Sequence, residues 1–415
     1  MSTEPLTTRG TSVCRGCGSR DLVSVLDLGA QPIANELLRD AGSVAPAFPL
    51  HLRICRDCAL GQVGEYVLPE RIFGSDYPYL SSTSSSWVRH ARAYADLVVA
   101  ELGLEPGDLA LEVASNDGYL LGGLQELGLR VLGVEPAANV AAIALERGVP
   151  TVTEFFTDSL APSLVAEHGH PRLVTANNVM AHVPDLDGFV AGLAALCDDR
   201  TVITVENPSL AALLTQRQFD TIYHEHFSYL SAHSVRSAVA AHGLELFRVE
   251  QLPTHGGSNR YWLARRGTRD VEESVAAVLG SERSAGLLES WLWVAFEDAS
   301  RAAVDGLRRW LDDRLANGRR VAAYGAAAKG MTLLNAAGIE GRHLEYVVDG
   351  SPEKQGCFLP GPGVPILAPA HLAEDPPDDV LLLPWNLAGE IVPLAAAAAP
   401  EAEVWVAIPE MSRLA

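Results

Sequence analysis

The feature that most limits the fold of this chain is an alternation of strand-like and helix-like segments that begins at Leu109. Apolar segments are expected to form strands up to residue 112 and over 130–136, 150–153 and 173–176, with helices after 118 and over 138–147. Alternation over this length is typical of a doubly wound parallel sheet. The sequence therefore predicts an α/β fold for the middle of the chain.

Residues 112–118 form the loop between the first strand and its helix, which is the position of a nucleotide-binding turn in such folds. The loop lacks the G-x-G-x-x-G pattern of a dinucleotide-binding turn. Glu135 ends the second strand, where an acidic side chain is suited to binding the diol of a ribose. These features indicate a ligand that contains a nucleoside.

The stretch 223–229, Tyr-His-Glu-His-Phe-Ser-Tyr, is dense in side chains that donate, accept or transfer protons. Such groups are costly to bury unless they serve a function. The stretch follows a strand expected at 200–206, so we expect it at the carboxyl end of the sheet, where α/β folds bind ligands. A surface loop rich in His and Tyr, or a metal cluster, is the alternative interpretation.

Four cysteines form two C-x-x-C pairs near the N-terminus. Each pair lets two thiolates from one tight turn occupy neighbouring corners of a tetrahedron, and Gly16 and Gly18 suit the first turn. A redox pair is the competing interpretation, but a thioredoxin-like motif needs a βαβ context that is absent here. We expect one structural Zn²⁺ in a closed site with no open position for chemistry. Its ligands are Cys14, Cys17, Cys55 and Cys58.

Composition excludes several classes of partner. The 415 residues, 48% of them hydrophobic, are enough for two or three domains. A formal charge of −21 argues against an extended surface for nucleic acid or anionic membrane. No apolar run reaches the roughly 20 residues of a membrane span, and the polar N-terminal segment lacks a signal-peptide core. We expect a cytoplasmic protein in which Cys197 and Cys357 pack as small apolar residues.

Residues 73–87 combine tyrosines with a run of hydroxyl side chains and lead into a helix expected over 87–102. The N-terminal amides of that helix can bind an anionic group. Tyr77 and Tyr79 lie just before the run and can reach the same ligand. An ordinary serine-rich linker with a helix N-cap is an equal alternative.

The last third of the chain is expected to begin with one or two long amphipathic helices over 271–315 and to continue as a second α/β unit. In the segment 320–330, small residues let the backbone approach a phosphate while Lys329 offers a point charge. A strand expected at 344–348 ends at Asp349. The aromatic residues expected to anchor the helices in the core are Trp291, Trp293, Phe296 and Trp310.

Several long motifs together resemble one family, the S-adenosylmethionine-dependent sugar C-methyltransferases that act on deoxysugar nucleotides in antibiotic biosynthesis. The resemblance runs from Cys14 to about Pro409. One departure is Ala114, where the family more commonly has glycine; a methyl group there is tolerable where the backbone φ is negative. The motifs are the two C-x-x-C pairs and the segments 112–118, 135–136, 177–182, 223–229, 255–260, 324–330, 349–356 and 384–386.

The resemblance implies a division of labour between the domains. The middle domain is expected to bind S-adenosylmethionine, and the C-terminal domain is expected to help hold the sugar nucleotide. The residues implied for the cofactor are Glu112, Ala114, Ser115, Asn116, Gly118, Glu135, Pro136, Asn177, Asn178 and His182. Those implied for the substrate are Tyr79, Ser82, His255, Asn259, Arg260, Tyr324, Lys329, Asp349, Lys354, Trp385 and Asn386.

Methyl transfer to carbon needs a carbanion-like nucleophile, and a sugar carbon becomes acidic enough only beside a carbonyl. The implied substrate is therefore a 4-keto sugar methylated at C3 or C5, with removal of the α-proton and stabilisation of an enolate. His226 is the expected base. Glu225 is expected to orient an imidazole or to stabilise the imidazolium, and Tyr223 and Tyr77 are expected to donate to the enolate oxygen. His224 is the alternative base, and we expect only one of the two histidines to face the sugar.

Other classes of function stay open at this point. An O- or N-methyltransferase would accept substrates without a ketone, and a binding scaffold would carry out no reaction. A nicotinamide-dependent oxidoreductase is disfavoured by the missing glycine pattern.

The expected architecture has three parts and acts as a monomer on a small-molecule sugar nucleotide. Residues 1–74 are expected to form a zinc-binding module, and 75–268 a Rossmann-like class I methyltransferase domain. Residues 269–415 are expected to form a helical connection and a C-terminal Rossmann-like α/β domain.

Overall fold

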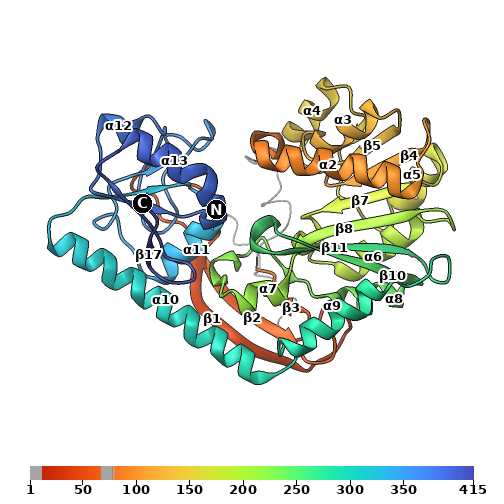
Figure 1. Ribbon diagram of the computed structural model, residues 1–415, viewed down its shortest axis with the longest axis horizontal. Helices are drawn as coiled ribbons and strands as arrows, with labels where there is room; N and C mark the ends of the chain where they lie inside the picture. The colour runs from red at the N-terminus through yellow and green to blue at the C-terminus, as the bar shows by residue number, and fades with distance from the viewer. Residues whose placement is uncertain (1–11, 67–76, 78–79) are drawn as a thin grey trace.

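The computed structural model describes residues 12–66, 77 and 80–415. These described residues form three sheets (Figure 1). The middle sheet and its helices lie on one side and the C-terminal sheet on the other, and the N-terminal strands and a long helix run between them. Tyr79 lies outside the described residues. Within the described residues, no helix combines the length and the apolar character needed to cross a membrane.

The N-terminal sheet contains a strand from a distant part of the chain. Its strands β1 (Leu22–Pro32), β2 (Ala47–Cys55) and β3 (Gly61–Gln62) are antiparallel. The fourth strand is β9 (Ser228–Tyr229), in which Ser228 pairs with Gln62. The proton-handling stretch of the sequence therefore ends as an edge strand of the N-terminal sheet.

The middle sheet has the order β10-β11-β8-β7-β4-β5-β6, in which β11 is antiparallel to both neighbours. The first strand, β4, lies between β5 and β7, so the chain order reverses at the β4–β7 boundary. Open α/β sheets bind ligands at such a reversal. The strands are β4 (Leu109–Val113), β5 (Arg130–Val134), β6 (Thr151–Val152), β7 (Leu173–Asn177), β8 (Val202–Pro208), β10 (Leu244–Leu252) and β11 (Ser258–Arg265).

Helices cover both faces of the middle sheet, which confirms the doubly wound α/β expectation. Apolar residues of α2 and α3 pack on one face, and those of α5, α6 and α8 on the other. Helix α2 begins where Ser84 accepts from the amide of Trp87, and it ends at Gly103, whose φ is 55°. The helices are α2 (Ser85–Leu102), α3 (Tyr119–Glu126), α4 (Ala138–Glu146), α5 (Ala161–His168), α6 (Leu186–Leu196), α7 (Leu210–Thr215) and α8 (Ala232–Ala241).

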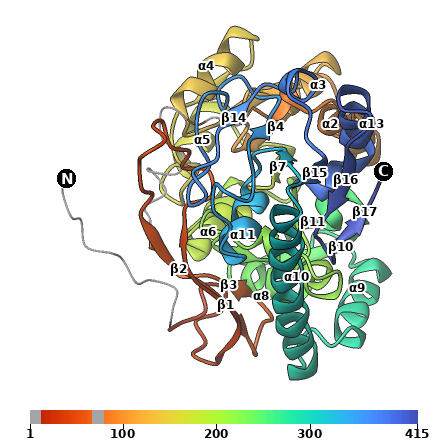
Figure 2. The ribbon, with the colours of Figure 1, turned by 90° about the vertical axis from the view of Figure 1, so that its left-hand side faces the viewer.

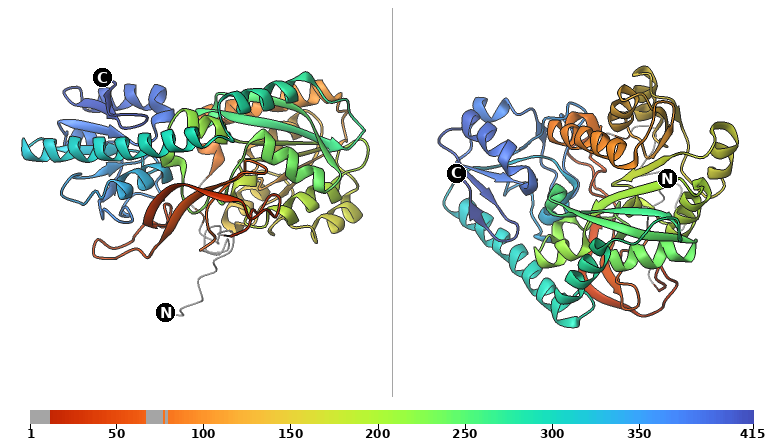
Figure 3. Two further views of the ribbon diagram at one scale, coloured as in Figure 1. Left: turned by 90° about the horizontal axis from the view of Figure 1, so that it is seen from below. Right: turned by 45° about the vertical axis from the view of Figure 1, so that its right-hand side comes forward.

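Two helices, α9 (Glu273–Ser284) and α10 (Ser290–Ala316), connect the middle and C-terminal sheets. Helix α10 crosses the molecule beside the N-terminal strands (Figures 2 and 3). One apolar core joins these strands, α7, α10 and the C-terminal sheet. Trp293 and Phe296 are buried in that core, as expected. Trp291 is 58% exposed, so its expected role as a core anchor was wrong: it lies on the outward face of the helix.

The C-terminal sheet has the order β14-β13-β12-β15-β16-β17, with β17 antiparallel. Taken from the edge, this matches β6-β5-β4-β7-β8-β11 of the middle sheet, including the antiparallel strand and the reversal beside the first strand. The strands are β12 (Val321–Tyr324), β13 (Val347–Val348), β14 (Ile366–Leu367), β15 (Asp379–Leu382), β16 (Glu403–Val406) and β17 (Ser412–Arg413). The helices are α11 (Ala328–Ala336), α12 (His371–Glu374) and α13 (Ala388–Ala398).

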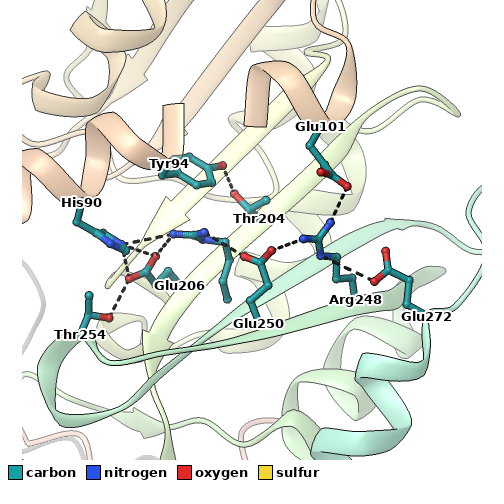
Figure 4. Close-up of polar contacts among 10 residues, drawn as sticks. His90, Tyr94, Glu101, Thr204, Glu206, Arg248, Glu250, Thr254 and Glu272 are labelled. Carbon is teal, nitrogen blue, oxygen red and sulfur yellow. Dashed lines mark hydrogen bonds and ion pairs between the residues drawn. The ribbon is translucent and has the colours of Figure 1, made fainter. Parts of the chain in front are cut away.

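An ion-pair network ties α2 to the far edge of the middle sheet (Figure 4). Arg260 donates to Glu206 at 2.8 Å and to Glu250 at 3.1 Å, and His90 donates to Glu206 at 2.9 Å. Burial alone would raise the pKa of Glu206, but the bonds from His90 and Arg260 lower it. Arg248 continues the network from Glu250 toward the surface. These charges are paired, as buried charges must be.

Arg260 was expected to bind substrate, and its surroundings favour a structural role. Its side chain is 4% exposed, both terminal nitrogens are paired with carboxylates, and Tyr94 lies 4.4 Å from its guanidinium carbon. A sequence pattern cannot reveal this, because the pairing acids come from other strands.

Replacing Arg260 should therefore act on stability. Arg260→Ala leaves Glu206 buried without its cation, which should cost about 3–5 kcal/mol of unfolding free energy. Arg248→Ala removes a 20% exposed cation of the same network and should cost about 1 kcal/mol or less. Urea unfolding measures both. Equal costs would contradict the assignment of Arg260 as the buried partner.

Candidate active site

Many of the residues expected to bind cofactor or substrate lie at or near the carboxyl ends of strands in the two matching sheets. In the middle sheet they follow β4, β5 and β7, on either side of the order reversal. In the C-terminal sheet they follow β12, β13 and β15, at the equivalent reversal. The turn that carries His226 lies between these two groups.

The loop after β4 is held by the acid at the end of β5. Glu135 accepts from the amide of Asn116 and from that of Ala137, each at 2.9 Å. Ser115 packs on Gly133 so closely that a side chain there would meet its hydroxyl at 2.3 Å. Pro136 follows Glu135 and leads into α4. Burial raises the pKa of Glu135, whereas its two backbone bonds lower it. Its carboxylate therefore faces the loop where a ribose diol was expected.

Three residues of this loop have a positive φ: Ala114 at 56°, Asn116 at 49° and Gly118 at 78°. The condition stated for Ala114, a negative φ, is not met. Ala114 therefore adopts a left-handed backbone conformation, which is less favourable for alanine than for glycine. A Cβ on Gly118 would lie 3.0 Å from Val149, so glycine is also needed there for space.

Buried oxygen atoms around the reversal have no hydrogen-bond partner among the described residues. They lie on Glu112 (Oε2), Asp117 (Oδ1), Asn177 (Oδ1) and Asn178 (Oδ1). Burial, and then repulsion from Glu135 and Asp117, raises the pKa of Glu112 well above its usual value. Buried acceptors without donors are costly. The donor groups of S-adenosylmethionine, its ribose hydroxyls and amino groups, fit these acceptors, so the residues suit that cofactor.

The segment before α2 lies against the cofactor loop. The amide of Ser81 donates to Asn116 at 2.8 Å, and Arg147 donates to the hydroxyl of Ser82 at 3.1 Å. The carbonyl of Tyr77 accepts from Asn139 at 2.9 Å. Ser82 therefore lies beside the loop expected to bind the cofactor, although it was expected to contact the substrate.

Residues 223–226 form a tight turn, in which the amide of His226 donates to the carbonyl of Tyr223 at 3.0 Å. These residues do not lie in a strand, because β9 begins only at Ser228. The two histidines of the turn still point in different directions. His224 donates to the carbonyl of Phe48 in β2 at 3.2 Å, and is buried there. His226 faces the other way, toward His182.

The backbone fixes the tautomer of His226. Its Nδ1 lies 3.1 Å from the carbonyl of Thr221, which can only accept, so Nδ1 carries the proton. Nε2 is then an acceptor, and the Tyr223 hydroxyl lies 2.8 Å from it. Burial, and then repulsion from His182, lowers the pKa of His226 well below its usual value. The neutral imidazole therefore presents its lone pair beside a tyrosine hydroxyl.

His182 and Glu225 are neighbours of His226; the first was expected to bind the cofactor and the second to orient an imidazole. The ring centroid of His182 lies 4.6 Å from that of His226, and its Nδ1 donates to the carbonyl of Glu225 at 2.7 Å. Burial lowers the pKa of His182 to about 4. The carboxylate of Glu225 accepts from the amide of Asn35 at 3.1 Å. The group that orients the imidazole of His226 is thus the Thr221 carbonyl, and Glu225 links the turn to the N-terminal module.

Of two expected residues that follow β10, His255 contacts the site and Asn259 is buried away from it. Nε2 of His255 accepts from Asn178 at 3.4 Å, and Trp87 lies 5.1 Å from its ring. Burial lowers the pKa of His255 to about 4. Asn259 is buried within β11, where its amide donates to the hydroxyl of Tyr261 at 3.2 Å.

The C-terminal domain brings a cation toward this group. Nζ of Lys329 donates to Asn386 at 2.7 Å and lies 4.5 Å from the centre of the Trp385 ring. Burial lowers the pKa of Lys329. Tyr324, the last residue of β12, is buried beneath the loop that leads to α11.

Asp349 repeats the arrangement of Glu135. It follows β13, and it accepts from Ala326 in the loop after β12 at 2.7 Å and from Ser351, two residues on, at 2.8 Å. Glu135 accepts from the equivalent loop and likewise from the residue two positions on. Lys354 lies 3.5 Å from Asp349 and donates to the carbonyl of Ala326. Each sheet thus has an acid that closes the loop at its order reversal.

The four N-terminal cysteines form a cluster. Their sulfur atoms lie within 4.8 Å of one another, with 3.5 Å between Cys14 and Cys58 and 3.6 Å between Cys17 and Cys55. Four thiolates around a tetrahedral zinc would be about 3.8 Å apart. The residues therefore fit Zn²⁺. Gly18, with a φ of 74°, makes the first turn; in the second, Ala59 takes a φ of 57°.

Three family models cover most of the chain. They are described as "Putative zinc binding domain" over 14–73, "Methyltransferase domain" over 87–249 and "C-methyltransferase C-terminal domain" over 253–409. The C-methyltransferase NovU of Streptomyces niveus is 37% identical over 382 residues, 91% of this chain and 91% of NovU. The chain therefore belongs to the family of S-adenosylmethionine-dependent C-methyltransferases.

Solved structures match the middle of the chain at low scores. Magnesium protoporphyrin IX methyltransferase (ChlM) from Synechocystis PCC 6803 with bound SAM is 19% identical at a TM-score of 0.33, covering 47% of this chain and 88% of that one. The PH0226 protein from Pyrococcus horikoshii OT3 is 14% identical at a TM-score of 0.37, covering 48% and 98%. Scores this low support no conclusion about the present chain.

Sequence reasoning missed the residues that position the turn through their backbone or through distant contacts. Thr221 acts through its carbonyl, and Asn35 through its amide, so neither side chain carries a signal. Asp220 is buried next to Thr221 and bonds to Trp385, 165 positions away. The sequence hint was weak: Asp220 follows Phe219 and is two positions before Ile222.

Loss of one thiolate should remove the metal. Cys55→Ser should lose zinc and melt at lower temperature than the unmodified protein, because structural zinc contributes folding energy. Cys197→Ala, which changes a buried cysteine outside the cluster, should keep one zinc per chain. Elemental analysis and thermal melts measure both. Zinc-free unmodified protein would contradict the assignment.

Because Ala114 has a positive φ, replacing it with glycine should stabilise the protein. Ala114→Gly should raise the unfolding free energy by up to about 1 kcal/mol, because relief in the left-handed region exceeds the added freedom of the unfolded chain. Ala142→Gly, at an exposed position of helix α4, should lower it by about 1 kcal/mol. Urea unfolding of both variants tests this, and a loss at both sites would refute it.

Proposed function

We propose that this C-methyltransferase transfers the methyl group of S-adenosylmethionine to a ring carbon of a dTDP-4-keto-deoxyhexose, C3 in preference to C5, through an enolate. The observation that carries the proposal is the fixed tautomer of His226, whose unprotonated Nε2 lies beside the Tyr223 hydroxyl. A carbon acceptor needs a proton removed before it can attack, and this pair supplies a base and a hydrogen-bond donor in one place.

The protein's part in the reaction starts with proton removal. His226 Nε2 takes the proton on the carbon next to the ketone, and the electrons of that C–H bond move into the enolate. Its lowered pKa keeps the imidazole unprotonated at neutral pH. Tyr223 turns its hydroxyl from Nε2 to the ketone oxygen and stabilises the developing charge. Tyr77 is assigned as a second hydrogen-bond donor to the ketone oxygen.

S-adenosylmethionine supplies an electrophilic methyl group, and the residues at the β4–β7 reversal are assigned to hold it. Glu135 would accept from the ribose hydroxyls, and the unpartnered oxygens of Glu112, Asn177 and Asn178 from the remaining donors. His182, packed on His226, would lie between this ligand and the base.

The C-terminal sheet is assigned to the sugar nucleotide. Lys329 offers a cation for the diphosphate, and Asp349 takes the place at β13 that Glu135 takes at β5, which suits a hydroxyl of the nucleoside sugar. With the two reversals on either side of His226, the carbon acceptor and the methyl donor would meet at the turn. The single structural Zn²⁺ would take no part in the chemistry, because four thiolates leave it no open position.

Proton removal can be measured apart from methyl transfer. In deuterated water without a methyl donor, the unmodified protein should exchange the proton next to the ketone of a thymidine-diphospho-4-keto-6-deoxy sugar, seen by NMR. His226→Asn should abolish exchange, lowering it by at least about 100-fold, the contribution of a positioned base. Binding of S-adenosylmethionine should stay near normal.

His224→Asn is the matched control, because this histidine bonds to Phe48 on the opposite side of the turn. It should keep exchange. Persisting exchange in His226→Asn would assign the base elsewhere. In complete reactions, a methyl group found on oxygen or nitrogen would overturn the C-methyl assignment for this substrate class.

A further inference from the structure

Asp220 has no part in the chemistry above, yet it lies where three parts of the site meet. It belongs to η3 (Phe219–Thr221), and its side chain is completely buried. Oδ2 accepts a hydrogen bond of 2.7 Å from Nε1 of Trp385. Oδ1 has no hydrogen-bond partner among the residues that the structure describes. A carboxylate with one unpartnered oxygen is costly to bury, so its presence needs an explanation.

Trp385 connects this carboxylate to a cation. The indole N–H points to Asp220, while the ammonium of Lys329 lies 4.5 Å from the ring centroid. Both contacts are favourable, since an anion accepts from the N–H and a cation lies on the negative face of the ring. Burial raises the pKa of Asp220 to about 6 and lowers that of Lys329, and each charge opposes the shift of the other.

The same region holds the catalytic turn. Thr221, the neighbour of Asp220, provides the carbonyl that orients His226. The carbonyl of Ile222 accepts from Thr332 of α11 at 2.8 Å. The Trp385 ring also packs against Gly256, where a side chain would come within 2.5 Å of it. Asp220 is therefore the point at which the C-terminal domain joins both the turn and the segment of His255.

We propose that Asp220 is a positioning residue for the anionic part of the substrate. Through Trp385 it holds Lys329 at the place where the diphosphate of a sugar nucleotide binds, and its negative charge is required for this. The inference rests on the proposed function of the C-terminal domain. Asp220 itself touches neither ligand.

The chain offers a matched arrangement away from the site. Asp379 is also completely buried, its Oδ1 accepts from Nε1 of Trp405 at 3.0 Å, and Arg314 lies 5.2 Å from the Trp405 ring. Asp379 begins β15, whereas Trp385 follows the other end of that strand. Oδ2 of Asp379 is paired with Arg314 and Arg319, so the contribution of these pairs to stability explains the buried Asp379–Trp405 contact. Asp379→Asn thus controls for the loss of a buried Asp–Trp contact.

The test is calorimetric binding of two probes, thymidine diphosphate and S-adenosylmethionine. Asp220→Asn keeps an acceptor for Trp385 but removes the charge. It should bind thymidine diphosphate about tenfold more weakly, the loss expected for one charged hydrogen bond, and S-adenosylmethionine within about twofold of normal. In turnover, KM for the sugar nucleotide should rise more than kcat falls. Asp379→Asn should bind both probes normally.

A second variant separates positioning from simple loss of stability. Trp385→Phe keeps an aromatic face for Lys329 but removes the N–H donor, and should weaken thymidine diphosphate binding by a similar factor. If Asp220 acts through Trp385, the double variant should bind no more weakly than either single variant. Should Asp220→Asn fail to fold, Trp385→Phe compared with Asp379→Asn decides the question.

The outcomes distinguish this inference from the function on which it rests. Failure of the unmodified protein to bind thymidine diphosphate would overturn both. Normal binding by Asp220→Asn and Trp385→Phe, with binding intact in the unmodified protein, would overturn the inference alone. An equal loss in Asp379→Asn would do the same, because it would trace the effect to stability.

Discussion

The geometry of the site depends on backbone bonds that hold one tight turn from several directions. The carbonyl of Thr221 accepts from His226 and so decides which ring nitrogen carries the proton. Beyond the turn, the backbone carbonyl of Phe227 accepts hydrogen bonds from the amide of Val63 and from the guanidinium of Arg15. Strand β9, which follows, pairs with β3. A loop held only by its own ends would not keep an imidazole in one tautomer and one orientation.

The four-cysteine module is connected to this turn through its second C-x-x-C pair. The second C-x-x-C turn leads directly into β3, and the carbonyl of Ala59 in that turn accepts from Ser231, just after β9. Zinc held by the four cysteines would fix the start of the short strand β3. The cluster thus acts on the site through strand pairing, at a distance from the reacting atoms.

Much of the fold could be predicted, because its strands and helices follow from the spacing of apolar and capping residues that are neighbours in the sequence. The strand at Leu173–Asn177 and the helix at Ala138–Glu146 follow from apolar spacing, and Ser84 caps α2 as a serine before a helix should. The partners of buried charges could not be predicted. Glu225 bonds to an amide 190 positions away, and Arg260 to acids on two other strands. Such pairings depend on how strands are ordered, which one sequence does not specify.

The repeated strand order gives the site its symmetry and also its main constraint. Two sheets with the same reversal each present a loop closed by an acid, Glu135 in one and Asp349 in the other. Under the proposed function, each sheet holds one ligand that contains a nucleoside, and the reactive ends of the two ligands meet between the sheets. The base and the hydrogen-bond donor that the proposed reaction needs there are supplied by the turn at His226. The C-terminal domain contacts that turn through the bond from Trp385 to Asp220 and the bond from Thr332 to Ile222. Under the proposed function, these two contacts set the distance between methyl donor and acceptor.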